Sequence, residues 1–152
     1  LSEPIERIAP SRILKIEAED FENAKEVKNA VYGFTGTGYL SLQEVTNSEL
    51  LFEIEHTQKA TYRMRFRYAN GLGSIEKSNQ AAVRSIYLDD FYYDSFVMPT
   101  RGLDEWDNWG YSSPILITLP AGKHQLKVKL EDQEKSPNMP VVHLDHVELC
   151  KL

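Results

Sequence analysis

The sequence predicts an all-β protein, an antiparallel β-sandwich or jelly roll of about nine short strands. Apolar and polar residues alternate over several short runs, as they do in strands with one buried and one solvated face. Glycine, proline, asparagine and aspartate separate these runs, which places turns between them. No segment carries a convincing apolar stripe at helical spacing, and no internal repeat is present.

The N-terminal part of the chain contains one strand and two turn-rich stretches. Residues 1–12 hold two prolines and mixed charges, so we expect a linker or an edge segment before a single domain over 13–152. The first strand is expected over 13–20, followed by a loop over 21–32. Residues 32–39 hold three glycines and three aromatic residues. This density predicts tight turns or close backbone approach, and no phosphate-binding motif accompanies it.

The remaining strands follow in quick succession. They are expected over 38–43, 49–56, 61–68, 82–88, 91–97, 114–119, 123–130 and 141–149. The run over 61–68 alternates most clearly, with apolar side chains on one face and Arg63, Arg65 and Arg67 on the other. Such a face could hold an anion, but a solvated face paired with neighbouring acids is the favoured interpretation. The predicted core includes Phe52, Ile54, Tyr62, Phe66, Leu126 and Val128.

Composition excludes several classes of function. The net charge of −6 argues against a nucleic-acid partner, and no apolar run approaches the ~20 residues of a membrane span. The single cysteine, Cys150, rules out an internal disulfide and is expected to be a buried or half-buried thiol. The sequence begins at Leu1 without a methionine or a secretory segment, so we expect a processed protein or a piece of a longer one.

Three acids are candidates for a common site. On a regular strand Glu17 and Glu19 point to the same side, about 7 Å apart at Cα. A second acid-bearing strand at the far end of the chain contributes Asp145, so three carboxylates converge if the first and last strands meet. A lysine, an arginine or a hard cation such as Ca²⁺ could neutralise them.

No enzyme motif is present, whereas the loops have a composition suited to sugar. The chain lacks a Gly-x-Ser-x-Gly elbow and a His-Glu-x-x-His motif. His143 and His146 lie three apart on a strand, so we expect them on opposite faces. Aromatic residues gather at 32–34 and 106–111, and loop amides include Asn70 and Asn138. Aromatic rings and amides on the loops of a rigid β scaffold are typical of a sugar-binding site.

Six short motifs in order resemble the β-jelly-roll carbohydrate-binding modules of families six and thirty-five. They are Glu17-Ala18-Glu19-Asp20, Gly33-Phe34-Thr35-Gly36-Thr37-Gly38-Tyr39, Phe66-Arg67-Tyr68-Ala69-Asn70-Gly71, Trp106-Asp107-Asn108-Trp109, Leu119-Pro120-Ala121-Gly122-Lys123-His124 and Leu144-Asp145-His146-Val147-Glu148-Leu149. The resemblance covers about residues 13–150. It implies a structural Ca²⁺ held by Glu17, Glu19 and Asp145, with backbone carbonyls from about 21–40.

The resemblance also implies a sugar site at the loop end of the sandwich. Its residues would be Phe34 or Tyr32, Trp106 or Trp109, and Asn138, with Asn70 as a further amide. We expect Trp106 to point outward and stack on sugar, and Trp109 to point inward as an anchor. The intervening residues 139–143 could displace Asn138 and bring His143 or Met139 to the site.

The function implied is that of a non-catalytic module attached to a secreted or cell-surface bacterial enzyme that degrades polysaccharides. Its partners would be a polysaccharide or oligosaccharide and the attached catalytic domain, with no nucleic acid and no membrane. Two alternatives remain open. One is a small catalytic domain, such as a polysaccharide lyase or esterase, and the other is a structural sandwich without a ligand.

Overall fold

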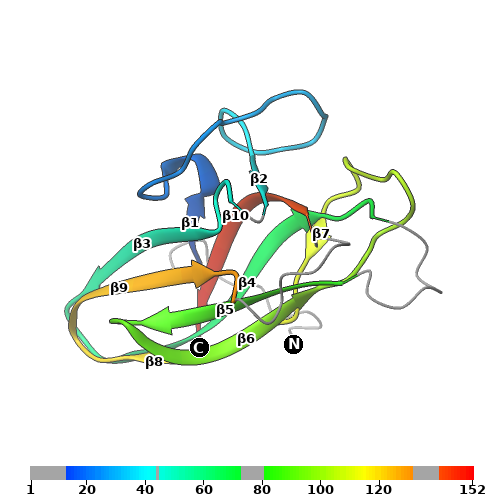
Figure 1. The fold of residues 1–152 in the computed structure, drawn as a ribbon. Coiled ribbons are helices and arrows are strands. Elements are labelled where there is room, and N and C mark those ends of the chain that lie inside the picture. The colour runs from blue at the N-terminus through cyan, green and yellow to red at the C-terminus, as the bar shows by residue number, and fades with distance from the viewer. Residues whose placement is uncertain (1–12, 44, 73–80, 132–140) are drawn as a thin grey trace, which may run out of the picture.

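The computed structural model describes residues 13–43, 45–72, 81–131 and 141–152. These residues form ten strands and one 3₁₀ turn, arranged as two antiparallel sheets packed face to face (Figure 1). The predicted all-β sandwich is therefore confirmed. The expected linker at 1–12 lies outside the described residues. In the part of the chain that is described, no helix is long and apolar enough to span a membrane.

Most neighbouring strands within the two sheets are distant in sequence; β5 and β6 are consecutive. Sheet A has the order β1-β10-β4-β7, and β2 also pairs with β10 and β8 with β4. Its strands are β1 (Ile13–Glu17), β2 (Leu40–Leu42), β4 (Ala60–Ala69), β7 (Gly110–Tyr111), β8 (Ile115–Leu119) and β10 (Val142–Lys151). Sheet B has the order β3-β9-β5-β6, with β3 (Glu49–His56), β5 (Ala82–Leu88), β6 (Phe91–Met98) and β9 (Gly122–Lys129).

The core follows the alternation seen in the sequence. All six predicted core residues are buried. Phe66 of sheet A stacks on Phe96 of sheet B, with ring centroids 4.2 Å apart, so aromatic rings join the two layers. On the other face of β4, Arg63 and Arg65 are exposed and Arg67 is half-buried, which confirms the predicted register.

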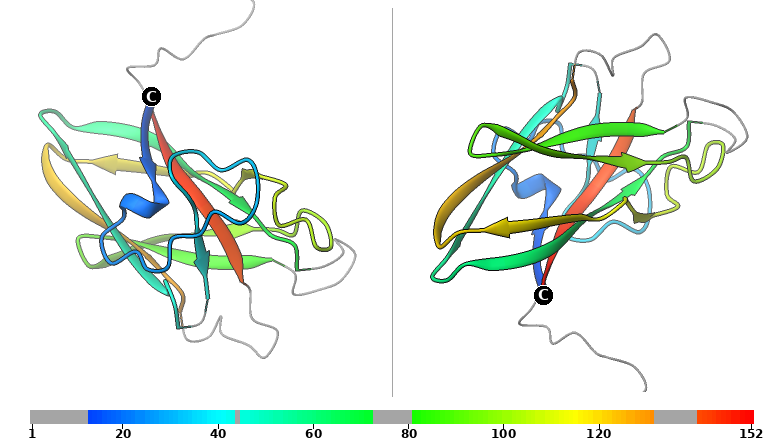
Figure 2. Two further views of the ribbon diagram at one scale, coloured as in Figure 1. Left: turned by 90° about the horizontal axis from the view of Figure 1, so that it is seen from above. Right: turned by 90° about the horizontal axis from the view of Figure 1, so that it is seen from below.

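Two local features of the fold differ from the prediction. The first strand ends at Glu17, and the turn η2 (Ala18–Asp20) then redirects the chain, so Glu19 does not continue the strand. The short strand β7 was not predicted. The loop expected over 21–32 continues to residue 39 and is drawn as the blue-to-cyan arch of Figure 2. Isolated bridges from Glu22 to Leu51 and from Lys28 to Tyr39 fasten it.

A β-bulge in β10 determines which side chains reach the outer face of sheet A. The register between β10 and β4 shifts between Leu144 and His146. Leu144 and Val147 are both in the core, while Asp145 and His146 between them both contact Thr35 outside it. The prediction that His143 and His146 lie on opposite faces is therefore wrong, because the bulge adds one residue to the alternation.

A histidine–aspartate pair joins the turn between β5 and β6 to the turn between β8 and β9. His124 Nδ1 lies 2.7 Å from Asp89 Oδ2, and His124 Nε2 lies 2.9 Å from the Pro120 carbonyl oxygen. Both partners only accept hydrogen bonds, so both ring nitrogens donate and the imidazole is charged. The hydrogen bond with Asp89 raises the pKa of His124, and the same bond lowers the pKa of Asp89.

This pair predicts a pH window of stability. The raised pKa of His124 stabilises the folded state below its ordinary value of 6.5, and the gain is lost as the pH rises through the folded value. The lowered pKa of Asp89 stabilises the fold above 3.8, and that gain is lost in acid. We therefore expect Asp89→Asn to lower the melting temperature more at pH 5 than at pH 9. An equal loss at both pH values, measured by differential scanning calorimetry, would contradict the charged pair.

Candidate functional site

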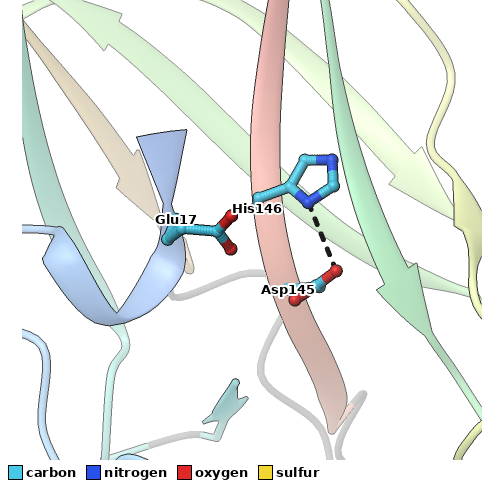
Figure 3. A group of neighbouring side chains, drawn as sticks. All are labelled: Glu17, Asp145 and His146. Atoms are coloured by element: carbon cyan, nitrogen blue, oxygen red, sulfur yellow. Dashed lines mark ion pairs between the residues drawn. The ribbon is translucent and has the colours of Figure 1, made fainter. Parts of the chain in front are cut away.

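The first and last strands meet, and their pairing brings acids together. β1 pairs with β10 over its whole length, and Glu17 lies opposite His146. Ligand atoms of Glu17, Asp145 and His146 all lie within 4.8 Å of one another (Figure 3). Asp145 and His146 are buried and Glu17 is half-buried. This is a compact group of two carboxylates and an imidazole, held by the end of one strand and the bulge of another.

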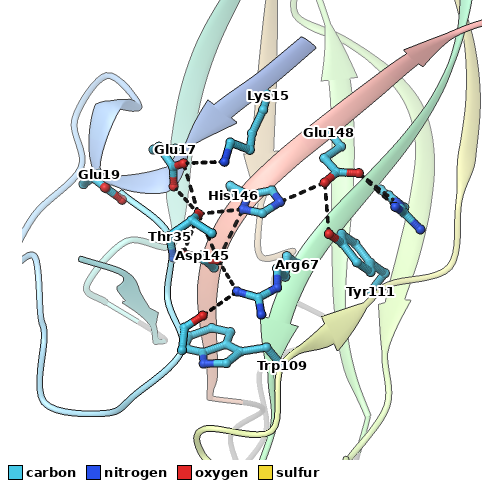
Figure 4. A network of polar contacts seen from close by, with 12 residues as sticks. Lys15, Glu17, Glu19, Thr35, Arg67, Trp109, Tyr111, Asp145, His146 and Glu148 are labelled. Atoms are coloured by element: carbon cyan, nitrogen blue, oxygen red, sulfur yellow. Dashed lines mark hydrogen bonds and ion pairs between the residues drawn. The ribbon is translucent and has the colours of Figure 1, made fainter. Parts of the chain in front are cut away.

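The Thr35 hydroxyl sits at the centre of this group (Figure 4). Its oxygen lies 2.7 and 3.0 Å from the two oxygens of Glu17, and 3.3 and 3.2 Å from the two oxygens of Asp145. His146 Nδ1 lies a further 2.9 Å away. A hydroxyl has one proton to donate, so it cannot satisfy four carboxylate oxygens at once. The oxygens are packed more closely than their hydrogen bonds explain.

Basic side chains neutralise two of the three predicted acids. Arg67 Nη1 lies 2.6 Å from Asp145 Oδ2, and Lys15 Nζ lies 3.3 Å from Glu17 Oε2. Burial tends to raise the pKa of Asp145. Hydrogen bonds from His146, Arg67 and the Thr35 N–H outweigh that effect, so the pKa falls below its ordinary value. Asp145 is therefore an ionised carboxylate in the interior.

The third acid, Glu19, lies beside this group but not within it. The turn that follows Glu17 places the Glu19 carboxylate beside the Thr37 backbone. The Thr37 N–H donates to Glu19 Oε2 over 2.7 Å. Glu19 Oε1 is buried and has no hydrogen-bond partner among the described residues. Gly36, at φ 65°, packs so closely against both Glu17 and Glu19 that a Cβ at this position would collide with the Glu19 carboxylate. Segment 35–37 is therefore shaped around two carboxylates.

This donor set fits a hard cation. Calcium prefers six to eight oxygen ligands, and Glu17, Glu19, Asp145 and the Thr35 hydroxyl all offer oxygen. Glu19 Oε1 has no hydrogen-bond partner among the described residues, and four carboxylate oxygens crowd around the Thr35 hydroxyl; a bound cation would account for both features. His146 is better suited to hydrogen bonding here, because imidazole nitrogen is not a preferred calcium ligand. The sequence analysis did not assign Thr35 or His146 to this site. The path of the loop places Thr35 there, and the bulge in β10 places His146 there.

An aromatic cluster lies next to the acids, on the same face of sheet A. His143 is at its centre, with ring centroids 4.7 Å from Tyr39, 4.8 Å from Trp106 and 6.5 Å from Trp109. Phe34 extends the cluster, 6.0 Å from Tyr39. Tyr39 is buried, and the other four side chains are half-buried. The cluster combines rings from two loops, 21–39 and 99–109, and from the strand β10, so tertiary structure creates it.

The two tryptophans differ less than the sequence predicted. Trp109 Nε1 donates to the Tyr32 carbonyl oxygen at 2.6 Å, and its ring packs against Gly33. The guanidinium of Arg67 lies 5.5 Å from the Trp109 ring. These contacts suit an anchor. Trp106 is also half-buried, because it lies against Gly71 and His143. The expectation of a fully outward Trp106 is therefore not met.

His143 presents a free acceptor inside the cluster. Its Nδ1 lies 3.2 Å from the Trp106 carbonyl oxygen, which can only accept, so Nδ1 carries the proton. Burial lowers the pKa of His143, which keeps the ring neutral. Nε2 is then an acceptor, and no described residue donates to it. The sequence analysis named His143 only as a residue that the intervening segment 139–143 could bring to the site in place of Asn138.

The remaining predicted sugar-binding residues fall in different places. Asn70 is fully buried; its Nδ2 donates to the Met98 carbonyl and its Oδ1 accepts from the Leu72 N–H. It fastens two loops and offers no surface to a ligand, which corrects the prediction. Tyr32 is 88% exposed, so its ring is available. Asn138 lies outside the described residues.

No family model matches the sequence. Two curated relatives are a cycloisomaltooligosaccharide glucanotransferase of Niallia circulans, 29% identical over 78% of this chain, and an isomaltosyltransferase of Sporosarcina globispora, 26% identical over 65%. The chain spans only 11% and 8% of their lengths. It therefore corresponds to a small part of much larger enzymes.

Solved structures identify the fold. The family 35 carbohydrate-binding module of Cellvibrio japonicus Abf62 superposes with a TM-score of 0.68, covering 90% of this chain and 91% of that one at 19% identity. The chain has the fold of a family 35 carbohydrate-binding module. Part of a Paenibacillus cycloisomaltooligosaccharide glucanotransferase also superposes on this chain, at a TM-score of 0.70 and 22% identity over 88% of this chain and 17% of that one. At these identities the similarity establishes the fold alone.

Proposed function

We propose that this chain is a non-catalytic carbohydrate-binding module and that its sugar site is the aromatic cluster around His143. The observation that carries the proposal is the unused Nε2 acceptor surrounded by Tyr39, Trp106 and Trp109. Ring faces pack against the C–H groups of a pyranose, and Nε2 accepts a hydrogen bond from a sugar hydroxyl. The neighbouring Phe34 and the exposed Tyr32 extend the apolar surface.

The relatives suggest the ligand class and the setting. The names of the glucanotransferase and the isomaltosyltransferase both refer to isomalto-oligosaccharides, which are α-1,6-linked glucose chains. We therefore infer that the cluster binds such chains. The small share of the relatives that is covered supports attachment to a catalytic domain in a longer, secreted bacterial enzyme.

A structural calcium belongs to the same proposal. Glu17, Glu19 and Asp145 would hold the ion, with Thr35 as a neutral oxygen donor. The ion would relieve repulsion among carboxylates that the fold forces together. Because Thr35 follows Phe34 in the chain, an ordered Thr35 fixes the loop that presents Phe34 to the sugar. The calcium stabilises this loop and does not take part in a reaction.

Titration calorimetry with isomaltotriose tests the sugar site. We expect binding by the parent chain, weaker binding of maltotriose, and about tenfold weaker isomaltotriose binding by His143→Phe, which keeps a ring but loses the acceptor. Tyr92→Phe is the matched control, because Tyr92 is exposed on sheet B and its hydroxyl contacts only Ser95 among the described residues. Unchanged affinity in His143→Phe would contradict the site. Cleavage of the oligosaccharide during the titration would favour the catalytic alternative.

A further inference from the structure

A groove on the outer face of sheet A has no role in the function proposed above. It has a volume of about 340 Å³, within the range of small-ligand sites, and we call it the arginine groove. Its lining includes Ile13, Arg63, Arg65, Tyr111, Pro114 and Glu148. Ile13 and Pro114 give it apolar walls, and the two guanidinium groups make it locally basic in a chain whose net charge is −6.

Of the three outward arginines of β4, one has no carboxylate partner among the described residues. Arg67 pairs with Asp145, and Arg65 pairs with Glu148 across the strands. The neighbours of Arg63 are Cys150 on β10 and Leu116 on β8, neither of which can accept its charge. No hydrogen bond or ion pair joins Arg63 to any residue in the described ranges. Its five N–H donors are therefore available to a ligand.

The second guanidinium of the groove is held rigidly. Arg65 Nε and Nη2 lie 3.1 and 2.9 Å from Glu148 Oε1, and its guanidinium lies 3.7 Å from the centre of the Tyr111 ring. Glu148 is fixed in turn by the Tyr111 hydroxyl at 2.9 Å and by His146 Nε2 at 3.2 Å (Figure 4). Arg65 Nη1 has no described partner, and Arg65 lines the groove together with Arg63, so the groove holds a second, preorganised guanidinium.

We propose that the arginine groove binds a sugar residue that carries an oxyanion substituent, either a carboxylate or a sulfate ester. Guanidinium groups bind such oxyanions through paired N–H donors, more strongly than they bind neutral hydroxyls. The apolar walls accommodate the C–H face of the ring. The site is separate from the aromatic cluster and does not depend on the function proposed for it.

Chemical-shift mapping with D-glucuronate, D-glucose 6-sulfate and D-glucose tests the proposal. We expect one or both charged sugars to shift the backbone amides of 63, 65 and 111, and D-glucose to leave them unmoved; the two charged probes distinguish carboxylate from sulfate. Arg63→Gln should weaken binding of the charged sugar about tenfold or more, since a hydrogen bond to a charged group is lost. Isomaltotriose binding at the aromatic cluster should stay as in the parent.

The control is Lys59→Gln, which removes the same charge from an exposed residue outside the groove. Equal weakening by this variant would show that only the overall charge attracts the sugar, and would overturn the proposal. Unchanged affinity in Arg63→Gln, or shifts confined to residues 34 and 143, would overturn it as well. If the parent chain binds the charged sugar at the groove but does not bind isomaltotriose, the result counts against the aromatic cluster and supports the groove. The melting temperature of each variant confirms that it is folded.

Discussion

Asp145→Ala is expected to lower the free energy of unfolding by about 3–5 kcal/mol, because it leaves a half-buried guanidinium without its acid. Asp145 has no exposed surface and accepts from Arg67 at 2.6 Å and from the Thr35 N–H at 2.9 Å. Both donors would lose their charged acceptor. Urea unfolding in the presence of a chelator measures this loss without a contribution from the metal.

The same variant tests the calcium site. In the parent chain, calcium at a hundred times its dissociation constant should stabilise the fold by about 2.7 kcal/mol. Asp145→Ala should lose that gain, while Asp20→Ala, which removes the exposed acid next to Glu19 in η2, should keep it. A calcium-dependent rise in melting temperature that survives in Asp145→Ala would remove Asp145 from the ligand set.

Trp109→Ala is expected to cost about 3 kcal/mol or more, as large-to-small changes at packed aromatic sites do. Trp109 holds the loop at Tyr32 through its Nε1, and its ring meets Tyr39 edge-on at 5.7 Å. Trp106→Ala should instead abolish isomaltotriose binding at a smaller cost in stability, because no described residue accepts from the Trp106 Nε1. Thermal unfolding and calorimetric titration of both variants separate the anchor from the stacking ring.

Trp109→Phe provides a control for this pair, since it keeps one aromatic ring but loses the donor to Tyr32 and part of the indole's packing area. Its stability should lie between those of the parent and Trp109→Ala. If Trp106→Ala binds isomaltotriose as tightly as the parent while remaining folded, Trp106 is not a sugar ligand. The exposed Tyr32 would then be the next ring to test.

The parts of the fold that depend on local alternation could be predicted from the sequence. The outward arginines and inward aromatics of β4 follow from a period of two, and so does most of the core. The meeting of Glu17 and Asp145 followed from placing the first and last strands side by side. In each case the prediction needed only the strand period and one pairing.

The parts that depend on breaks in regular structure could not be predicted. The 3₁₀ turn after Glu17 moves Glu19 away from the strand face, and the bulge at Asp145 brings His146 to the same side as its neighbour. Neither break has a glycine or proline to mark it. Asn70 appeared to be a free loop amide, whereas its side chain satisfies buried backbone groups at Met98 and Leu72. These outcomes depend on contacts between distant segments.

The pairing of β1 with β10 also brings the start of the first strand beside the end of the last one. Ile13 lies opposite Cys150, so the chain enters and leaves the sandwich at one corner. His143 stands seven residues before Cys150 on the same strand, which places the aromatic cluster roughly 20–25 Å from that corner. If the chain is part of a longer enzyme, as proposed above, a connection at either of these strand ends would start at the end of the sandwich opposite the rings. The sugar-binding surface of such a module would face away from the point of attachment and would be open to a long polymer.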